Sequence, residues 1–136
     1  NTVTGQRLDN HFTASFDGGK AWTEPKTTGI HGQASSLCHL EGETFLALHA
    51  VRRDTDRPGI YGYIVDFSNR TWDIKTQFLL WEPAVPVFKD NKMAEIFSFL
   101  KFGQPIAIKL QDGTLMVSFW YAQEGQYKTT CINIKL

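Results

Sequence analysis

The order of apolar and polar residues divides much of the chain into short strand-like segments separated by turns. Four such segments follow one another, and each is rich in the aromatic and β-branched residues typical of strands. They are predicted at residues 34–40, 44–51, 60–67 and 72–81. The connections carry turn residues, including Glu41-Gly42 and a charged loop that ends at Pro58-Gly59. The pattern predicts four consecutive antiparallel strands.

The same pattern starts again further along the chain, with strands predicted at 106–110 and 114–120. Trp22 and Trp72 recur at an offset of 50 residues, and an insertion at 83–102 explains why the later offset is 70. A four-stranded unit that recurs about every 50 residues is typical of a β-propeller blade. The residues that recur at an offset of 70 are Leu40, Thr44, Phe45 and Leu46, which correspond to Leu110, Thr114, Leu115 and Met116.

The insertion has two interpretations. Residues 91–102 form either a short amphipathic helix or a loop that covers the top of the blade. The apolar face of the helix would consist of Met93, Ile96, Phe97 and Leu100.

A tight turn is predicted after a strand-like run at residues 11–16. Asp17 can accept hydrogen bonds from backbone N–H groups, and the two glycines that follow it tolerate positive φ. Ser15 can add a second local hydrogen bond. Trp22 is expected to fold back over the turn and to begin a short strand at 23–30, which Pro25 interrupts.

The composition is that of one soluble globular domain or part of one. The 136 residues have a formal net charge of +0, with 42% hydrophobic and 21% charged residues. The balanced charge argues against a nucleic acid or a membrane surface as partner. No apolar run has the length of a transmembrane helix, and Asn1 opens no signal-peptide pattern. The 13% aromatic content, together with the strand-like segments, favours an all-β fold.

Cys38 and Cys131 lie far apart in the sequence and lack the spacing of a metal site. Buried free thiols are preferred over a disulfide, because free cysteines are often buried. No metal and no cofactor are expected.

The residues Ser15, Asp17, Gly19 and Trp22 complete the pattern Ser-x-Asp-x-Gly-x-x-Trp. This pattern resembles the Asp box, the bacterial neuraminidase repeat of sialidase-like β-propellers, where it has a structural role. Asp66 and Trp72 form a degenerate second copy. Further segments resemble bacterial six-bladed members of that family: Gly32-Gln33, Leu40-Glu41-Gly42, Arg53 to Ile60, Gly103-Gln104-Pro105 and Leu110 to Leu115.

The resemblance implies an all-β fold that is the C-terminal portion of a six-bladed propeller, about two and a half blades of it. In this interpretation 1–31 is the end of one blade, 32–82 a full blade, 83–102 an insertion and 103–136 the start of the last blade. So few blades cannot close a propeller, which has roughly four to eight. The expected partners are therefore the remaining blades of a parent chain or further copies of this chain.

The resemblance also implies a sialidase-like glycoside hydrolase that acts on a glycan and is secreted or periplasmic. Sialidases grip the substrate carboxylate with three arginines and use a Tyr nucleophile paired with Glu, together with an Asp acid. Arg53, or Arg52, is a candidate arginine. The position of the nucleophile falls on Gln104, so the catalytic pattern is incomplete and no catalytic residue is assigned.

Propeller topology places the connections from second to third strand, and from blade to blade, at the end where substrate sites lie. Arginine can bind a carboxylate through two parallel hydrogen bonds, and aromatic rings can stack on sugar faces. Packing of the aromatic residues and simple surface exposure of the charged ones are the alternatives. The candidate substrate-binding residues are Arg52, Arg53, Asp54, Gln104, Trp120, Tyr121 and Glu124, and His31, Gln33, Arg57, Trp81, Glu82 and Tyr127 are expected at the same end.

Two further functions stay open from the sequence. One is a non-catalytic propeller that binds a glycan or small carbohydrate through Arg53 and the aromatic residues. The other is a protein-interaction propeller whose loops make the contacts. A pair of carboxyl groups spaced for glycoside hydrolysis would favour the enzyme, and an exposed apolar patch without a pocket would favour protein interaction.

Overall fold

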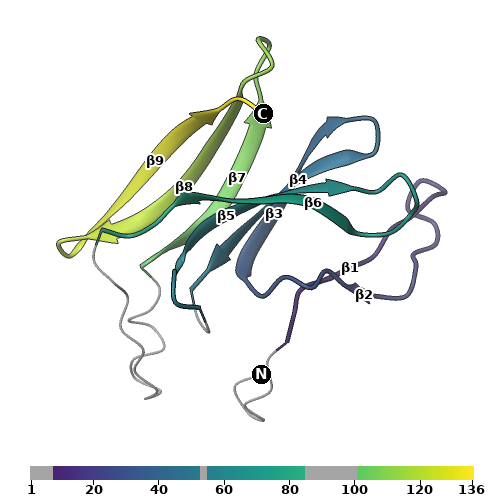
Figure 1. Ribbon diagram of the computed structural model, residues 1–136, viewed down its shortest axis with the longest axis horizontal. Coiled ribbons are helices and arrows are strands. Elements are labelled where there is room, and N and C mark those ends of the chain that lie inside the picture. Colours follow the sequence, from purple (N-terminus) through teal and green to yellow (C-terminus); the bar gives the residue numbers. More distant parts are fainter. Residues whose placement is uncertain (1–7, 53–54, 85–100) are drawn as a thin grey trace. The chain divides into compact units, whose positions relative to one another are not determined.

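The computed structural model describes residues 8–52, 55–84 and 101–136 and divides the chain into two compact units, Asn1–Gly32 and Gln33–Leu136. Each unit is described by itself. The described residues form nine β-strands and no helix (Figure 1). The all-β prediction is therefore confirmed for this part of the chain.

The first unit contains one small antiparallel pair. Strand β1 (His11–Phe12) pairs with β2 (Lys26–Thr27). Asn10 closes the pair: its N–H donates to the carbonyl of Ile30, and its carbonyl accepts from the N–H of Thr28, both at 2.8 Å. The strand predicted over 23–30 is thus limited to two residues, which follow Pro25.

The second unit begins with the four-stranded sheet that the hydrophobic pattern predicts. Its strands lie in chain order and pair antiparallel, and each observed boundary falls within a residue or so of the predicted one. They are β3 (Gln33–Glu41), β4 (Thr44–Val51), β5 (Gly59–Asp66) and β6 (Asp73–Trp81).

A three-stranded antiparallel sheet follows, with β7 (Phe102–Lys109), β8 (Leu115–Gln123) and β9 (Gln126–Ile134). Strand β7 starts four residues earlier than predicted, so Phe102 belongs to a strand and not to a helix. The rest of the segment with the two interpretations, residues 91–100, lies outside the described residues.

Strand β9 was not predicted. It is joined to β8 by the two-residue turn Glu124-Gly125, which has φ values of 52° and 75°. Positive φ at both positions is the mark of a type I′ hairpin turn, usually made by Asn-Gly or Asp-Gly. Glutamate is a poor indicator of such a turn, and this hid a strand that contains β-branched Thr130, Ile132 and Ile134.

The two sheets of the second unit pack face to face, and their facing side chains make the core. Alternation along β4 turns Leu46, Leu48 and Ala50 to one side of the sheet. From the other sheet, β8 contributes Leu115, Val117 and Phe119 to the same cluster. Removing these side chains from water stabilises the fold by roughly 25 cal/mol per Å² of apolar surface.

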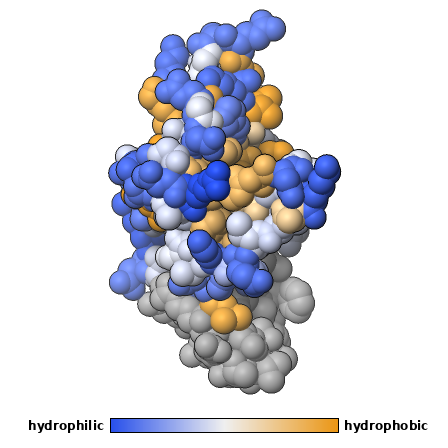
Figure 2. All heavy atoms as spheres, turned by 90° about the vertical axis from the view of Figure 1, so that its right-hand side faces the viewer, coloured by the Kyte–Doolittle hydropathy of each residue, from blue (hydrophilic) through white to orange (hydrophobic). Residues whose placement is uncertain are grey.

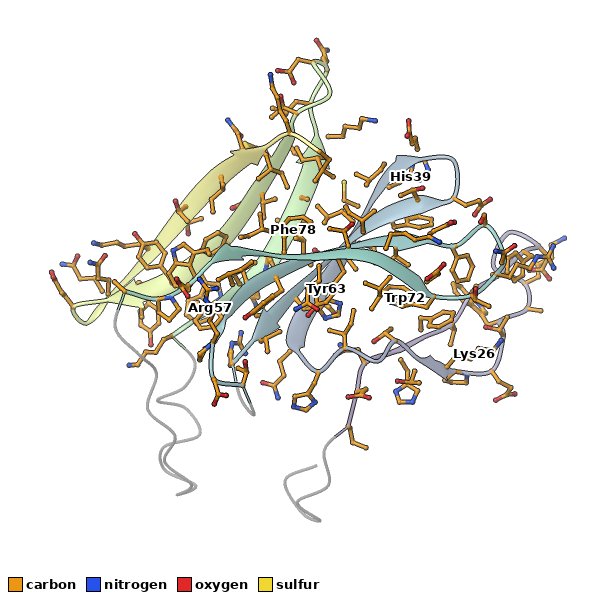
Figure 3. All side chains as sticks on the ribbon, viewed as in Figure 1. Lys26, His39, Arg57, Tyr63, Trp72 and Phe78 are labelled. Atoms are coloured by element: carbon orange, nitrogen blue, oxygen red, sulfur yellow. The ribbon has the colours of Figure 1, made fainter. Side chains whose placement is uncertain are left out.

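The opposite face of the four-stranded sheet also carries buried residues, with Ala47 and Val65 fully inaccessible. Figure 3 shows Tyr63 and Phe78 on opposite sides of this sheet. His49 is only 3% exposed and meets the ring of Tyr63 edge-on, with ring centroids 5.5 Å apart. No hydrogen-bond partner reaches its Nδ1 within the described residues. Burial disfavours the imidazolium and lowers the pKa of His49 to about 4.

The surface is mixed rather than uniformly polar. Figure 2 shows one face of the molecule, where apolar side chains lie between polar ones. Several of the large exposed apolar residues lie on the three-stranded sheet, among them Ile106 (57%), Ile108 and Tyr127 (76%). These positions alternate with buried ones, so they share the face that points away from the core.

Cys38 and Cys131 are both free. Cys38 is half-buried and packs against the core, whereas Cys131 is exposed on β9. The expectation of burial is therefore wrong for Cys131. The cause is that β9 was not recognised, so the alternation that turns Cys131 outward could not be read.

Replacing Gly62 by alanine is expected to destabilise the second unit by about 1–3 kcal/mol. The new Cβ would stand 2.6 Å from the Phe78 ring and 3.3 Å from Leu46. Urea denaturation followed by circular dichroism measures this loss. The double variant G62A/F78L removes the facing ring atoms and is expected to recover part of it; equal losses in the single and double variants would contradict the clash.

His49 is expected to make stability depend on pH. The unfolded chain has the ordinary histidine pKa of 6.5 and binds the proton first as pH falls. The contribution of His49 is therefore complete above pH 6.5 and is lost towards its folded-state pKa of about 4, by at most ~3 kcal/mol. Phe119 follows His49 at the repeat offset of 70 residues, which makes H49F the matched variant. Urea midpoints measured across this pH range are expected to fall less in H49F than in the parent chain; parallel curves would sink the assignment.

Candidate functional site

The turn with the Asp-box pattern is built as its residue types predict. The Ser15 hydroxyl donates to Asp17 Oδ1 and accepts from the N–H of Gly19, both at 2.8 Å. The same carboxylate oxygen accepts from the N–H groups of Lys20 and Ala21 at 3.0 Å. These hydrogen bonds, that of Ala21 first, lower the pKa of Asp17. The carboxylate thus holds the turn closed, which is a structural role.

Trp22 departs from the expectation for this turn, because its side chain is 63% exposed and does not shield the turn from solvent. The degenerate copy before Trp72 is also simpler. Asp66 accepts one turn hydrogen bond, from the N–H of Ser68 at 2.9 Å, and Lys75 lies 3.5 Å from its other oxygen. Both contacts lower the pKa of Asp66.

In the second unit, the antiparallel order separates the connections into two ends, as predicted. One end holds the β4–β5 loop, the end of β6, the start of β7 and the β8–β9 turn (Figure 1). The other end holds the β3–β4, β5–β6 and β7–β8 turns. In Figure 3, Arg57 and His39 mark these two ends of the four-stranded sheet. We call the first the site end, because the candidate substrate-binding residues of this unit were predicted there.

Arg52 is held between the two sheets. Its Nε donates to the carbonyl of Phe102 at 2.7 Å, and its guanidinium lies 5.8 Å from the centre of the Phe102 ring. A longer contact of 3.5 Å joins Nη1 to Gln33 Oε1. The guanidinium also occupies the space where a side chain at position 103 would begin, so Gly103 is needed for this close approach. Arg52 therefore ties the end of β4 to the start of β7.

Tyr121 belongs to the same inter-sheet region. Its ring lies 5.4 Å from that of Trp81, which also contacts Phe102 at 5.3 Å and Phe119 at 5.2 Å. Trp81 ends β6 and reaches across to the three-stranded sheet, so it closes the core at the site end. Sequence reasoning placed Trp81 at this end but did not identify it as the aromatic centre of the junction.

Trp120 lies on the other face of the three-stranded sheet. Side chains alternate along β8, so consecutive Trp120 and Tyr121 point to opposite sides. Trp120 contacts the ring of Tyr127 at 5.7 Å with an interplanar angle of 60°. We call Trp120 and Tyr127 the aromatic pair. The hairpin register, in which Ala122 faces Tyr127, brings the two rings together.

Gln104 and Glu124 are exposed at the site end, and both have positive φ, 51° and 52°. Gln104 lies within the irregular register between Gly103 and Ile106, and Glu124 lies in the β8–β9 turn. Positive φ at a residue other than glycine is uncommon and turns the side chain away from the regular strand direction. Arg53 and Asp54 lie outside the described residues, so their role stays a prediction.

An exposed ion pair closes the β4–β5 loop onto the end of β6. Arg57 donates from Nε and Nη2 to the two carboxylate oxygens of Glu82, at 2.7 and 3.0 Å. The pair raises the pKa of Arg57 and lowers that of Glu82. Tyr61 adds a hydrogen bond from its hydroxyl to the Arg57 carbonyl at 2.7 Å. A carboxylate ligand would have to replace Glu82 to be bound by this arginine.

Within the described ranges, no cluster of three or more His, Cys, Asp or Glu side chains is arranged to hold a metal ion. The same ranges contain no helix that is long and apolar enough to span a membrane. Comparisons of the chain with protein-family models, with curated proteins and with solved structures find no match.

The contact between Arg52 and Gly103 leads to a double-mutant prediction. R52M removes the hydrogen bond to Phe102, and G103A is expected to displace the same guanidinium. Each change is expected to cost about 1–2 kcal/mol of unfolding free energy, and the double variant is expected to cost less than the sum. Urea denaturation measures all three. R57Q, in the same loop but in an exposed pair, is the control with an unchanged midpoint. Additive losses would show that Gly103 does not act through Arg52.

Proposed function

We propose that this chain is part of a sialidase-like β-propeller that acts on glycans, and that its described residues bind glycan rather than cleave it. The proposal has two supports. The stacking of the two sheets favours the propeller, and the aromatic pair with its polar neighbours favours glycan binding. The resemblance carried by the Asp box connects the two.

The sheets of the second unit stack in one repeated orientation. At the repeat offset of 70 residues, Ala47 and His49 correspond to Val117 and Phe119, which face the four-stranded sheet. Leu46 corresponds to Met116, on the outer face of the three-stranded sheet. Equivalent faces therefore point the same way in both sheets. This head-to-tail order is what successive propeller blades require, whereas a two-fold sandwich would bring equivalent faces together.

The aromatic pair is the single observation that carries glycan binding. Tyr127 is 76% exposed, and its ring is supported by Trp120 at the site end. A rigid, exposed ring with a polar hydroxyl offers an apolar face to a sugar ring and a hydrogen-bond group to its hydroxyls. Gln104 and Glu124, both exposed at the same end, add further hydrogen-bonding groups.

The carboxyl chemistry favours binding over hydrolysis in this part of the chain. A general acid in glycoside hydrolysis needs a raised pKa. The pKa of Glu82 is lowered instead, because Arg57 occupies both of its oxygens. Gln104, at the expected nucleophile position, carries an amide and cannot act as a nucleophilic phenol.

The experiment is a titration of ¹⁵N-labelled chain with sialyllactose and, separately, with lactose. Binding at the site end is expected to shift the indole N–H signal of Trp120 and the amide signals around Tyr127. Y127A is expected to weaken binding about tenfold, the equivalent of ~1.4 kcal/mol, because the stacking ring is lost.

F16A is the matched control, since Phe16 is an exposed aromatic residue of the Asp-box turn in the other unit. It is expected to bind like the parent chain. Binding of neither sugar, or equal weakening by Y127A and F16A, would contradict the proposed site. Preference for sialyllactose over lactose would indicate that the carboxylate of sialic acid is recognised.

A further inference from the structure

The sheet edges of the second unit differ in how well they are protected against pairing with another strand. An edge strand presents backbone N–H and C=O groups that can pair with a further chain, and proteins block this with bulges, charges or proline. In the part of the chain that the structure describes, the two sheets of this unit end at β3, β6, β7 and β9.

Three of these edges carry protection. Strand β3 has an irregular register at both of its ends. Strand β6 has two register shifts and begins with the charged residues Asp73 and Lys75. Strand β7 contains Pro105 within an irregular stretch of its register.

Strand β9 has none of these features. All nine of its residues pair with β8 in unbroken register, from Gln123 opposite Gln126 to Leu115 opposite Ile134. The strand contains no proline, and Lys128 is its single charged residue. A long, regular edge of this kind is one that readily accepts another strand.

The hairpin turn decides which backbone groups of β9 point to the open edge. In a two-residue hairpin loop the flanking residues, Gln123 and Gln126, exchange their backbone hydrogen bonds. Residues 128, 130 and 132 therefore also bond to β8. The N–H and C=O groups that point away from β8 belong to Tyr127, Thr129, Cys131 and Asn133.

The four-stranded sheet gives the type of strand that belongs there. At the repeat offset, β7 and β8 correspond to β3 and β4, so β9 takes the place of β5. Strand β5 is paired on both sides, with β4 and with the antiparallel strand β6. The equivalent antiparallel place beside β9 is open within the described residues.

We propose that β9 pairs antiparallel with β9 of a second copy of this chain, across a two-fold axis, and so joins two three-stranded sheets into one of six strands. The strand is self-complementary in charge. In registers centred on residues 129 to 131, Lys128 faces Thr130, Ile132 or Ile134 and never its own copy. Such an interface is isologous and closes at two chains.

Amide hydrogen exchange measured by NMR at low and high protein concentration tests the pairing. The amides of residues 128, 130 and 132 are expected to be protected at both concentrations, by β8. The amides of Tyr127, Thr129, Cys131 and Asn133 are expected to exchange at least tenfold more slowly at the high concentration only. Light scattering on the same samples is expected to show a change from one to two chains.

T129P is the variant to test, because it removes one edge N–H and leaves the hydrogen bonds to β8 in place. It is expected to stay monomeric at the concentration where the parent chain is dimeric, with an unchanged circular dichroism spectrum. T129A keeps the N–H, and as the matched control it is expected to dimerise like the parent chain.

Three results would overturn the proposal. The first is a monomer at every concentration. The second is a dimer whose four edge amides exchange as fast as in the monomer, which would place the interface elsewhere. The third is protection of those amides at every concentration, which would mean that a strand of the same chain occupies the edge. The exchange pattern decides the question even if T129P does not fold.

Discussion

The burial of apolar side chains between the two sheets of the second unit is the constraint on which the rest of this unit depends. One face of β4 and β5 meets the inner face of β7 and β8, and neither sheet could bury that face without the other. Trp81 closes this core at the site end through contacts with three aromatic rings. Arg52 fixes the start of β7 there by its hydrogen bond to the Phe102 carbonyl. The site end is therefore held in place by core packing, and its loops project from a rigid base.

This packing divides the predicted substrate-binding residues into two groups. Arg52 and Tyr121 take part in the junction between the sheets, whereas Trp120 lies on the outer face beside Tyr127. Sequence reasoning brought these residues to one end, because the connections alternate between two ends. It could not separate the two faces without the register of β8. Adjacent residues in a strand share an end but never a face.

The sequence was sufficient where the local pattern and the turn chemistry agree. Strands β4 and β5 are bounded by Gly42 and by Pro58-Gly59, and their observed limits follow the hydrophobic run closely. The Asp17 turn formed as predicted, because all of its hydrogen bonds are local. The sequence was insufficient where the outcome depends on tertiary contacts. The close approach of Arg52 to Gly103 joins residues about 50 positions apart, and no local pattern could have predicted it.

The outer face of the three-stranded sheet follows from the same repeat. Ile106 and Ile108 correspond, at the offset of 70 residues, to Ser36 and Cys38, which lie on the face that β3 turns towards the core. Their exposure is thus the exposure of a face whose equivalent is buried one sheet earlier. Apolar residues at such positions are retained at a cost in solubility unless something covers them. The same reasoning applies to β9, whose equivalent, β5, is paired on both sides. Both the outer face and the edge therefore mark the side of this unit where the repeat calls for another β-sheet.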